Sequence, residues 1–253
     1  MDEVKYEEIK SNFFRNLIDL KMNLEQYLIQ TKDIAGKFGG PSVYFHNRAL
    51  QEINIDFLGH THIEMIYAVL PSWGMHRMGN TSTKVINFNE FNNQINNNRW
   101  LLKELKDKSI KDIDINDLSN LIVKKLSFSI SESHLVSSSK VLHHIIPNLV
   151  SPIDKQYSIR FLMQSKSQFL SRSENGKVKF SAITYKNDDE VDYSNIFLSG
   201  MHEFIEKNES ILIKYLDKED NLNKNFNSSL TKILDNLIMV YVKNNGVKED
   251  KVQ

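Results

Sequence analysis

Apolar side chains recur every three or four residues along most of the chain, the spacing that places them on one face of an α-helix. Residues 4–30 are the first such segment, and its apolar positions are Ile9, Phe13, Leu17, Leu20, Leu24 and Leu28. This spacing predicts one long amphipathic helix. The helix is expected to end within "AGKFGGPS" at residues 35–42, where glycines and Pro41 interrupt helical hydrogen bonding.

Further helices are predicted in the next hundred residues. The segment "HTHIEMIYAVLPSWGMHRMG", residues 60–79, indicates a helix that is interrupted by Pro71 and ends between Gly74 and Gly79. Residues 87–106 are rich in asparagine but keep an approximate helical spacing of apolar side chains, which favours a helix with a polar face. Asp117 is then expected to be the N-cap of another helix.

The second half of the chain continues this pattern. We expect a helix from about Ser138 to Ile146, a loop through Pro147 and Pro152, and a new helix from Asp154. Two further helices are predicted within residues 195–216 and 228–244.

One segment alternates as a strand does. In "KVKFSAITY", residues 177–185, Val178, Phe180 and Ala182 alternate with other side chains after the turn signal Asn175-Gly176, which predicts a small hairpin within residues 169–185. The βαβ alternation of nucleotide-binding folds is missing. The sequence therefore predicts a mainly α, multi-helix globular domain over residues 1–253, in one lobe or two, with at most one small β-hairpin.

Composition agrees with a globular chain. Of the 253 residues, 40 % are hydrophobic and 25 % are charged, which is ordinary for a folded domain. No apolar run approaches the roughly 20 residues that span a bilayer, and "MDEVKYEEIK" is acidic where a signal peptide is basic. We expect a cytoplasmic protein without a membrane partner. The absence of cysteine excludes disulfides, thiolate metal sites and a cysteine nucleophile.

The charge balance bears on nucleic-acid binding. The 32 basic and 32 acidic side chains give a formal net charge of zero, so no global field attracts nucleic acid and any such binding needs a local patch. One candidate patch lies between residues 155 and 180, where only Glu174 opposes Lys155, Arg160, Lys166, Arg172, Lys177 and Lys179. The alternative is a chance cluster on a solvated surface.

Known signatures for phosphates and metals do not match. "AGKFGGPS" lacks the spacing of a phosphate loop. "DIDIND" from Asp112 has Asp117 where a calcium loop needs glycine and Val123 where it needs glutamate, which favours a loop before a helix. Adjacent histidines such as His143 and His144 point about 100° apart on a helix.

The remaining metal candidate is the group His60, His62 and Glu64. These side chains could converge on one ion only from an extended segment, and a solvated helix start is the favoured alternative. We predict no metal and no cofactor.

Two segments combine glycine or proline with aromatic, histidine and arginine side chains. They are "FGGPSVYFHNRAL", with Tyr44, Phe45, His46 and Arg48, and "LPSWGMHRMG", with Trp73, His76 and Arg77. Aromatic rings offer stacking faces and arginine offers a planar donor fork, so these residues are candidates for substrate binding. The alternative is that the rings belong to the core and the polar side chains cap helices.

The segment "SSSKVLHHIIPNLVSPIDKQYSIRFL", residues 137–162, combines a serine-rich start, a short helix, a proline loop and "PID" before another helix. It resembles the latter part of the helix-hairpin-helix DNA glycosylase superfamily. By this resemblance, which covers residues 134–162, Asp154 matches the catalytic aspartate, and His134 to Lys140 takes the place of the DNA-binding hairpin turn. Val136 stands where lyase members carry a lysine, which implies a hydrolase that forms no Schiff base.

Two hypotheses follow. In the first, the chain is a nucleic-acid-processing enzyme, a monofunctional DNA glycosylase-like hydrolase in which Tyr44, Phe45 or Trp73 stacks an extruded base and Asp154 performs the chemistry. Lys140 and His144 join Asp154 as candidate catalytic groups, and the nucleic-acid contacts are Ser137, Ser138, Lys155 and Arg160.

The second hypothesis is a non-catalytic helical binding protein, a nucleic-acid accessory or defence component. Asp154 is then only a helix cap. The first hypothesis requires the aromatic residues and Asp154 to line one cavity, whereas the second leaves them dispersed.

Overall fold

A computed structural model describes residues 1–35, 40–75, 85–130, 133–169, 172–174, 177–179, 183, 185–218 and 221–246. Within these residues the chain is mainly helical, as its periodicity predicts. Buried apolar side chains from Ile9 to Val242 form one contiguous cluster. In the described part of the chain, no helix combines the length and the apolar character needed to cross a bilayer.

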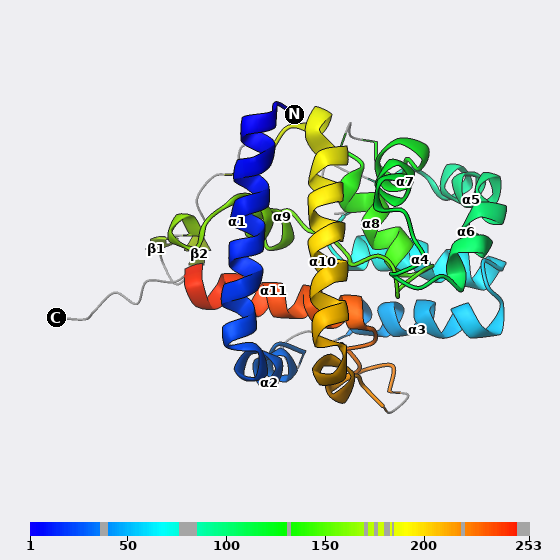
Figure 1. Ribbon diagram of the computed structural model, residues 1–253. Helices are drawn as coiled ribbons and strands as arrows, with labels where there is room; N and C mark the ends of the chain where they lie inside the picture. Colours follow the sequence, from blue (N-terminus) through cyan, green and yellow to red (C-terminus); the bar gives the residue numbers. More distant parts are fainter. Residues whose placement is uncertain are drawn as a thin grey trace.

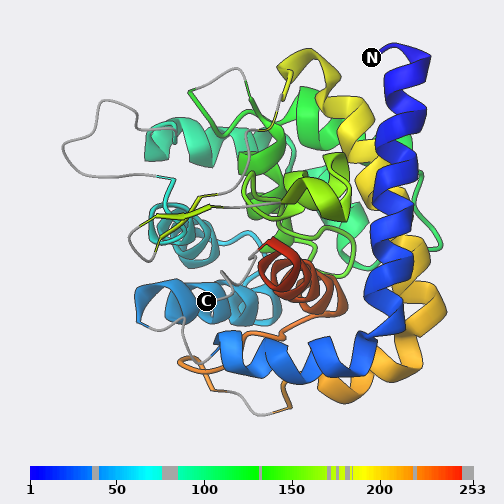
Figure 2. The ribbon, with the colours of Figure 1, turned by 90° about the vertical axis from the view of Figure 1, so that its left-hand side faces the viewer.

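The predicted N-terminal helix is two helices, α1 (Glu3–Met22) and α2 (Leu24–Ala35). The backbone N–H of Asn23 donates to Leu20 O at 3.2 Å, which ends α1. The chain then turns, so that α1 packs against α9 and α10 while α2 packs against α11 (Figures 1 and 2). The prediction of one helix was wrong at Asn23. The apolar stripe before Asn23 packs on α9 and α10, whereas the stripe after it packs on α11.

Helices α3 (Pro41–Ile55) and α4 (His60–Ser72) form a hairpin that places Trp73 at its end. A Cβ at Gly59 in the connection would lie 1.7 Å from Asp56 Oδ2, so any other residue there would displace the exposed Asp56 side chain. Helix α4 continues through Pro71 and ends at Ser72, and Gly74 takes a φ of 80°. It therefore ends two residues before the predicted range of Gly74 to Gly79, of which residues 76–79 lie outside the described residues.

The next elements are α5 (Phe88–Asn97), α6 (Arg99–Lys106), α7 (Ile115–Asn120) and the π-helical turn η1 (Leu121–Lys125). The single helix expected over residues 87–106 is interrupted at Asn98. The N-cap of α7 is Asp114, whose side chain accepts the N–H of Asp117 at 2.9 Å. Asp117 was therefore the wrong cap, although the loop before the helix is confirmed.

Helices α8 (Leu135–His143) and α9 (Ser158–Met163) flank the proline loop. Residues 135–140, where the family resemblance places a hairpin turn, are the first turns of α8, so that assignment was wrong. The helix expected from Asp154 begins at Ser158, and residues 155–157 form a separate turn.

The C-terminal part contains η2 (Lys166–Phe169), η3 (Asn187–Asp189), α10 (Glu190–Leu212), η4 (Ile213–Tyr215) and α11 (Leu230–Gly246). Strands β1 (Arg172–Glu174) and β2 (Lys177–Lys179) pair antiparallel, with Arg172 opposite Lys179, which confirms the predicted hairpin. Its turn signal Asn175-Gly176 lies outside the described residues.

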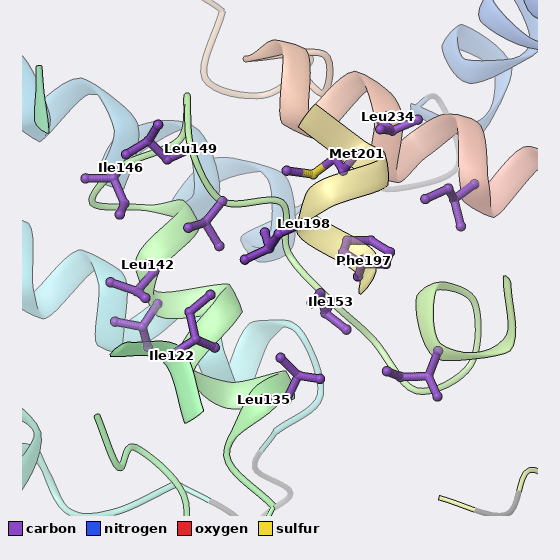
Figure 3. Close-up of a cluster of buried hydrophobic side chains, with 14 of the residues drawn as sticks. Ile122, Leu135, Leu142, Ile146, Leu149, Ile153, Phe197, Leu198, Met201 and Leu234 are labelled. Atoms are coloured by element: carbon purple, nitrogen blue, oxygen red, sulfur yellow. The ribbon is translucent and has the colours of Figure 1, made fainter. Parts of the chain in front are cut away.

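Helix α8 lies in the core, between the α3–α4 hairpin and α10 (Figure 1). Figure 3 shows Leu135 and Leu142 of α8 in one cluster with Leu198 and Met201 of α10 and Leu234 of α11. Because both α8 and α11 bury apolar faces there, their remaining faces are fixed relative to one another. These remaining faces line the candidate site.

Candidate functional site

A cavity of about 660 Å³ lies where α8, residues 152–157 and α11 meet the end of α4. Its size is within the range of about 300–1,000 Å³ that is typical of small-molecule sites. The side chains that give it chemical character are Trp73, Ser137, Lys140, Asp154, Tyr157, Tyr185, Phe226, Lys232 and Asp235. Two members of the predicted catalytic set, Lys140 and Asp154, are therefore together in one cavity with the predicted aromatic Trp73.

Helix α8 forms one wall. Val136, Ser137 and Lys140 share one face of the helix and line the cavity, because residues three or four apart lie on the same side. Lys140 is only 8 % exposed, and its Nζ lies 6.0 Å from the centre of the Trp73 ring.

The first turn of α8 is fixed by Glu190 from α10, which is 1 % exposed. Oε2 of Glu190 accepts the backbone N–H groups of His134 and Leu135, and Oε1 accepts the hydroxyls of Ser133 and Tyr185. Burial and the nearby Glu190 carboxylate raise the pKa of Tyr185. Since Ser133 and Tyr185 line the cavity, Glu190 positions part of its wall without reaching it.

Asp154 is half-buried and lies at the turn before α9, where it also borders the cavity. Its Oδ1 accepts the backbone N–H of Tyr157 at 2.7 Å, which stabilises the turn before α9, and the residue also lines the cavity. Burial raises the pKa of Asp154, the Asp235 carboxylate raises it further, and the Tyr157 amide opposes both effects. A carboxylate with a raised pKa is a better proton acceptor near neutral pH than an ordinary aspartate.

Lys232 and Asp235 of α11 were missed by the sequence analysis. Their side chains form an ion pair with Lys232 Nζ 2.5 Å from Asp235 Oδ2, and Nζ also donates to Asn236 Oδ1 at 3.0 Å. Nζ lies 4.2 Å from the Phe226 ring centre and 5.4 Å from that of Trp73. The available signal was two charged residues three apart in a helical segment whose other side chains are mostly apolar.

His46 and His144 were predicted to bind substrate and to take part in catalysis, but both are fully buried and neither lines the cavity. Because the Lys140 carbonyl can only accept, Nδ1 of His144 carries a proton and donates to it at 2.7 Å. Nε2 of His144 then accepts from Nδ1 of His46, and Nε2 of His46 accepts from the Ser228 hydroxyl, both at 2.9 Å. These histidines support the wall behind Lys140 and Trp73.

With one ring proton each, His46 and His144 are neutral, and burial favours the neutral form of the neighbouring histidines as well. Burial lowers the pKa of His144 to about 3 and that of His62 to about 4, and it lowers the pKa of His46 and His143 well below 6.5. Neighbouring histidines lower the pKa of His46 and His143 further. The prediction that His46 and His144 act on substrate is therefore corrected.

The two aromatic-basic segments have different positions. Trp73 lines the cavity, donates from Nε1 to Ser42 O at 3.1 Å and packs against His46 with ring centres 5.4 Å apart. Tyr44 and Phe45 contact each other outside the cavity, and Arg48 forms an ion pair with Glu52 on its own helix. His76 and Arg77 lie outside the described residues.

The predicted nucleic-acid contacts are also divided. Lys155 is exposed at the cavity rim, with Nζ 5.4 Å from the Tyr185 ring centre, and Ser137 faces the cavity. Ser138 is fully buried and donates to Leu126 O at 3.2 Å, while Arg160 is 5 % exposed and donates to Gln164 Oε1 at 2.6 Å. Ser138 and Arg160 therefore face the interior, which corrects their assignment to a nucleic-acid surface.

No metal ligands gather around the histidine-rich start of α4. His60 is exposed and lies 3.1 Å from Glu64, whereas His62 is buried and accepts the N–H of Leu58. Among the described residues, no group of three or more histidine or carboxylate side chains is arranged to hold an ion.

Comparisons with known proteins find no matching protein-family model, no significantly similar curated sequence and no solved structure with a significant match.

Proposed function

We propose that this chain is a nucleic-acid-processing protein, a monofunctional DNA glycosylase-like hydrolase whose cavity receives one extruded nucleotide. The observation that carries the proposal is that Asp154, Lys140 and Trp73 line one cavity. An enzyme that acts on a base in duplex DNA has to move that base out of the stack into such a pocket, where an aromatic ring can stack on it.

Asp154 supplies the chemistry in this proposal. Its carboxylate takes a proton from a water molecule that attacks C1′ of the sugar, the bond between C1′ and the base breaks, and the leaving base receives the proton. A held carboxylate also stabilises the positive charge that develops on the sugar. Lys140, which lines the cavity, attracts the adjoining phosphate group electrostatically.

The surface charge implies weak and salt-dependent binding of nucleic acid. The formal net charge is zero, Lys155 contributes at the rim, and Lys166 is already 2.9 Å from Asp19. With few phosphate contacts available, affinity is expected to be low and to fall as salt increases.

The test is incubation of the protein with damaged, mismatched and single-stranded oligonucleotides, followed by strand analysis. Asp154→Asn keeps an oxygen that can accept the Tyr157 N–H but removes the carboxylate, so stability should change little while base release is lost. Borohydride should trap no covalent complex, because the resemblance places Val136 where a Schiff-base lysine stands. A complex trapped through Lys140 would contradict the monofunctional mechanism.

The second candidate is a non-catalytic helical binding protein. The observation that favours it is the hydrogen bond from the Tyr157 N–H to Asp154 Oδ1, which gives this carboxylate a structural role. Absence of binding to every oligonucleotide at low salt would reject the nucleic-acid proposal and leave this candidate.

A further inference from the structure

The cavity contains an ion pair that its own neighbours leave incompletely hydrogen-bonded. Asp235 is 5 % exposed, yet among the described residues Lys232 is the one group that donates to its carboxylate. A carboxylate has about four acceptor positions, and one donor does not fill them. The other oxygen, Oδ1, therefore has acceptor capacity beside the cavity that the residue lines.

Lys232 places a donor next to this acceptor. Its Nζ and the Asp235 carboxylate are held together by the ion pair at 2.5 Å, and Asn236 fixes the lysine from the far side. Phe226 and Trp73 line the same end of the cavity, with their ring centres 4.2 Å and 5.4 Å from Nζ. The arrangement offers aromatic contact for a planar ligand, together with a cationic donor and an anionic acceptor.

We propose that Lys232 and Asp235 recognise the edge of a nucleobase that carries a carbonyl beside a ring N–H, as in hypoxanthine, guanine and uracil. The carbonyl oxygen accepts from Lys232 Nζ, and the ring N–H donates to the Asp235 carboxylate. Adenine and cytosine have a ring nitrogen acceptor in place of that N–H, so they would leave a lone pair facing the carboxylate. This inference rests on the proposed function, because it takes the ligand of the cavity to be a nucleobase.

Free nucleosides test it without any oligonucleotide. The matched pair is 2′-deoxyinosine and 2′-deoxyadenosine, which differ at this edge and share the rest of the molecule. Deoxyuridine and deoxycytidine form a second pair. Binding is measured by ligand-detected NMR titration, and in each pair the member with a ring N–H beside its carbonyl, deoxyinosine or deoxyuridine, is expected to bind about 10- to 100-fold more tightly, the effect of one hydrogen bond to a charged group.

The variant is Lys232→Met together with Asp235→Leu, which replaces the ion pair by apolar side chains and leaves no unpaired charge. It should abolish the preference within each pair. Asp235→Asn, which keeps the residue's size, is the second variant and should reduce the preference at least about tenfold. The matched control is Glu203→Gln with Lys207→Met, an exposed ion pair on α10, which should leave the preference unchanged.

Equal affinity of the wild type for both members of each pair, or no binding of any nucleoside, would overturn the inference. An unchanged preference in folded variants would also overturn it. Asp154→Asn separates this result from that of the proposed hydrolysis, because it should lose base release and keep the nucleoside preference. A preference among nucleosides without activity on oligonucleotides would reject the hydrolase and support the recognition site.

Discussion

Acidification is expected to destabilise this protein strongly, because four of its buried histidines, which lie close together, are neutral in the folded state. They are His46, His62, His143 and His144, and burial is the main cause of the lowered pKa of each. Below the ordinary pKa of 6.5, the unfolded chain binds more protons than the folded one. Stability is therefore complete above about pH 6.5 and is lost as the pH falls toward the folded values of about 4 for His62 and about 3 for His144.

The size of the stability loss follows from the difference between the pH and the pKa of histidine in the unfolded chain. At about pH 5, some 1.5 pH units below the unfolded value, each histidine that stays neutral costs about 2 kcal/mol of unfolding free energy. If all four stay neutral, they together cost about 8 kcal/mol, and any proton that the folded cluster binds reduces this cost. Typical domains have about 5–15 kcal/mol in total. The cluster is thus sufficient to bring the protein close to unfolding.

The measurement is the free energy of unfolding in urea, followed by circular dichroism, at several values between about pH 7.5 and pH 5. His62→Gln is the informative variant, since a glutamine can accept the Leu58 N–H and donate to His144 O without titrating. It should remove about 2 kcal/mol of the pH-dependent loss. His60→Gln is the control, because His60 is exposed. If the wild type loses less than about 1 kcal/mol of unfolding free energy between these pH values, the reasoning is refuted.

Three further predictions concern single side chains. Glu190→Ala should cost about 3 kcal/mol or more in urea unfolding at neutral pH, because it leaves two backbone N–H groups and two hydroxyls without their acceptor; a loss below about 1 kcal/mol would contradict this role. Gly200→Ala should cost about 1–3 kcal/mol in the same assay, since a Cβ there would lie 2.5 Å from Phe13 Cε1 between α10 and α1, and a gain in stability would show that this contact can relax. If the chain hydrolyses nucleic acid, its single-turnover rate should fall as the pH is lowered from about 7.5 to 5, where the protein is still folded, because the pKa of Asp154 is raised above the 3.8 of an ordinary aspartate; a rate that stays constant over this range would contradict Asp154 as the base.

The helices were largely predictable from the sequence, because helix formation depends on hydrogen bonds and side-chain spacing within a few residues. The end of α4 was predicted from Pro71 and Gly74 to within a few residues, and the small hairpin was predicted from its alternation. The breaks at Asn23 and Asn98 were missed. Neither has a glycine or proline signal, and at Asn23 the direction changes because α2 packs against α11.

The site was predictable only in part. Trp73 and Asp154 stood out because they follow breaks in apolar helices, and both line the cavity. The sequence alone does not distinguish His46 and His144 from histidines that act on a substrate. Burial keeps both neutral, and they support the cavity wall from behind.

What the sequence determined by itself was the helical class and the residue types available for chemistry. The tertiary structure decided which of them meet. Lys232 and Asp235 are far in sequence from Lys140 and Asp154. They line the same cavity because α8 and α11 each bury an apolar face in the shared core. Local periodicity determines which face of a helix is apolar, but only the packing of the whole chain determines what the opposite face lies against.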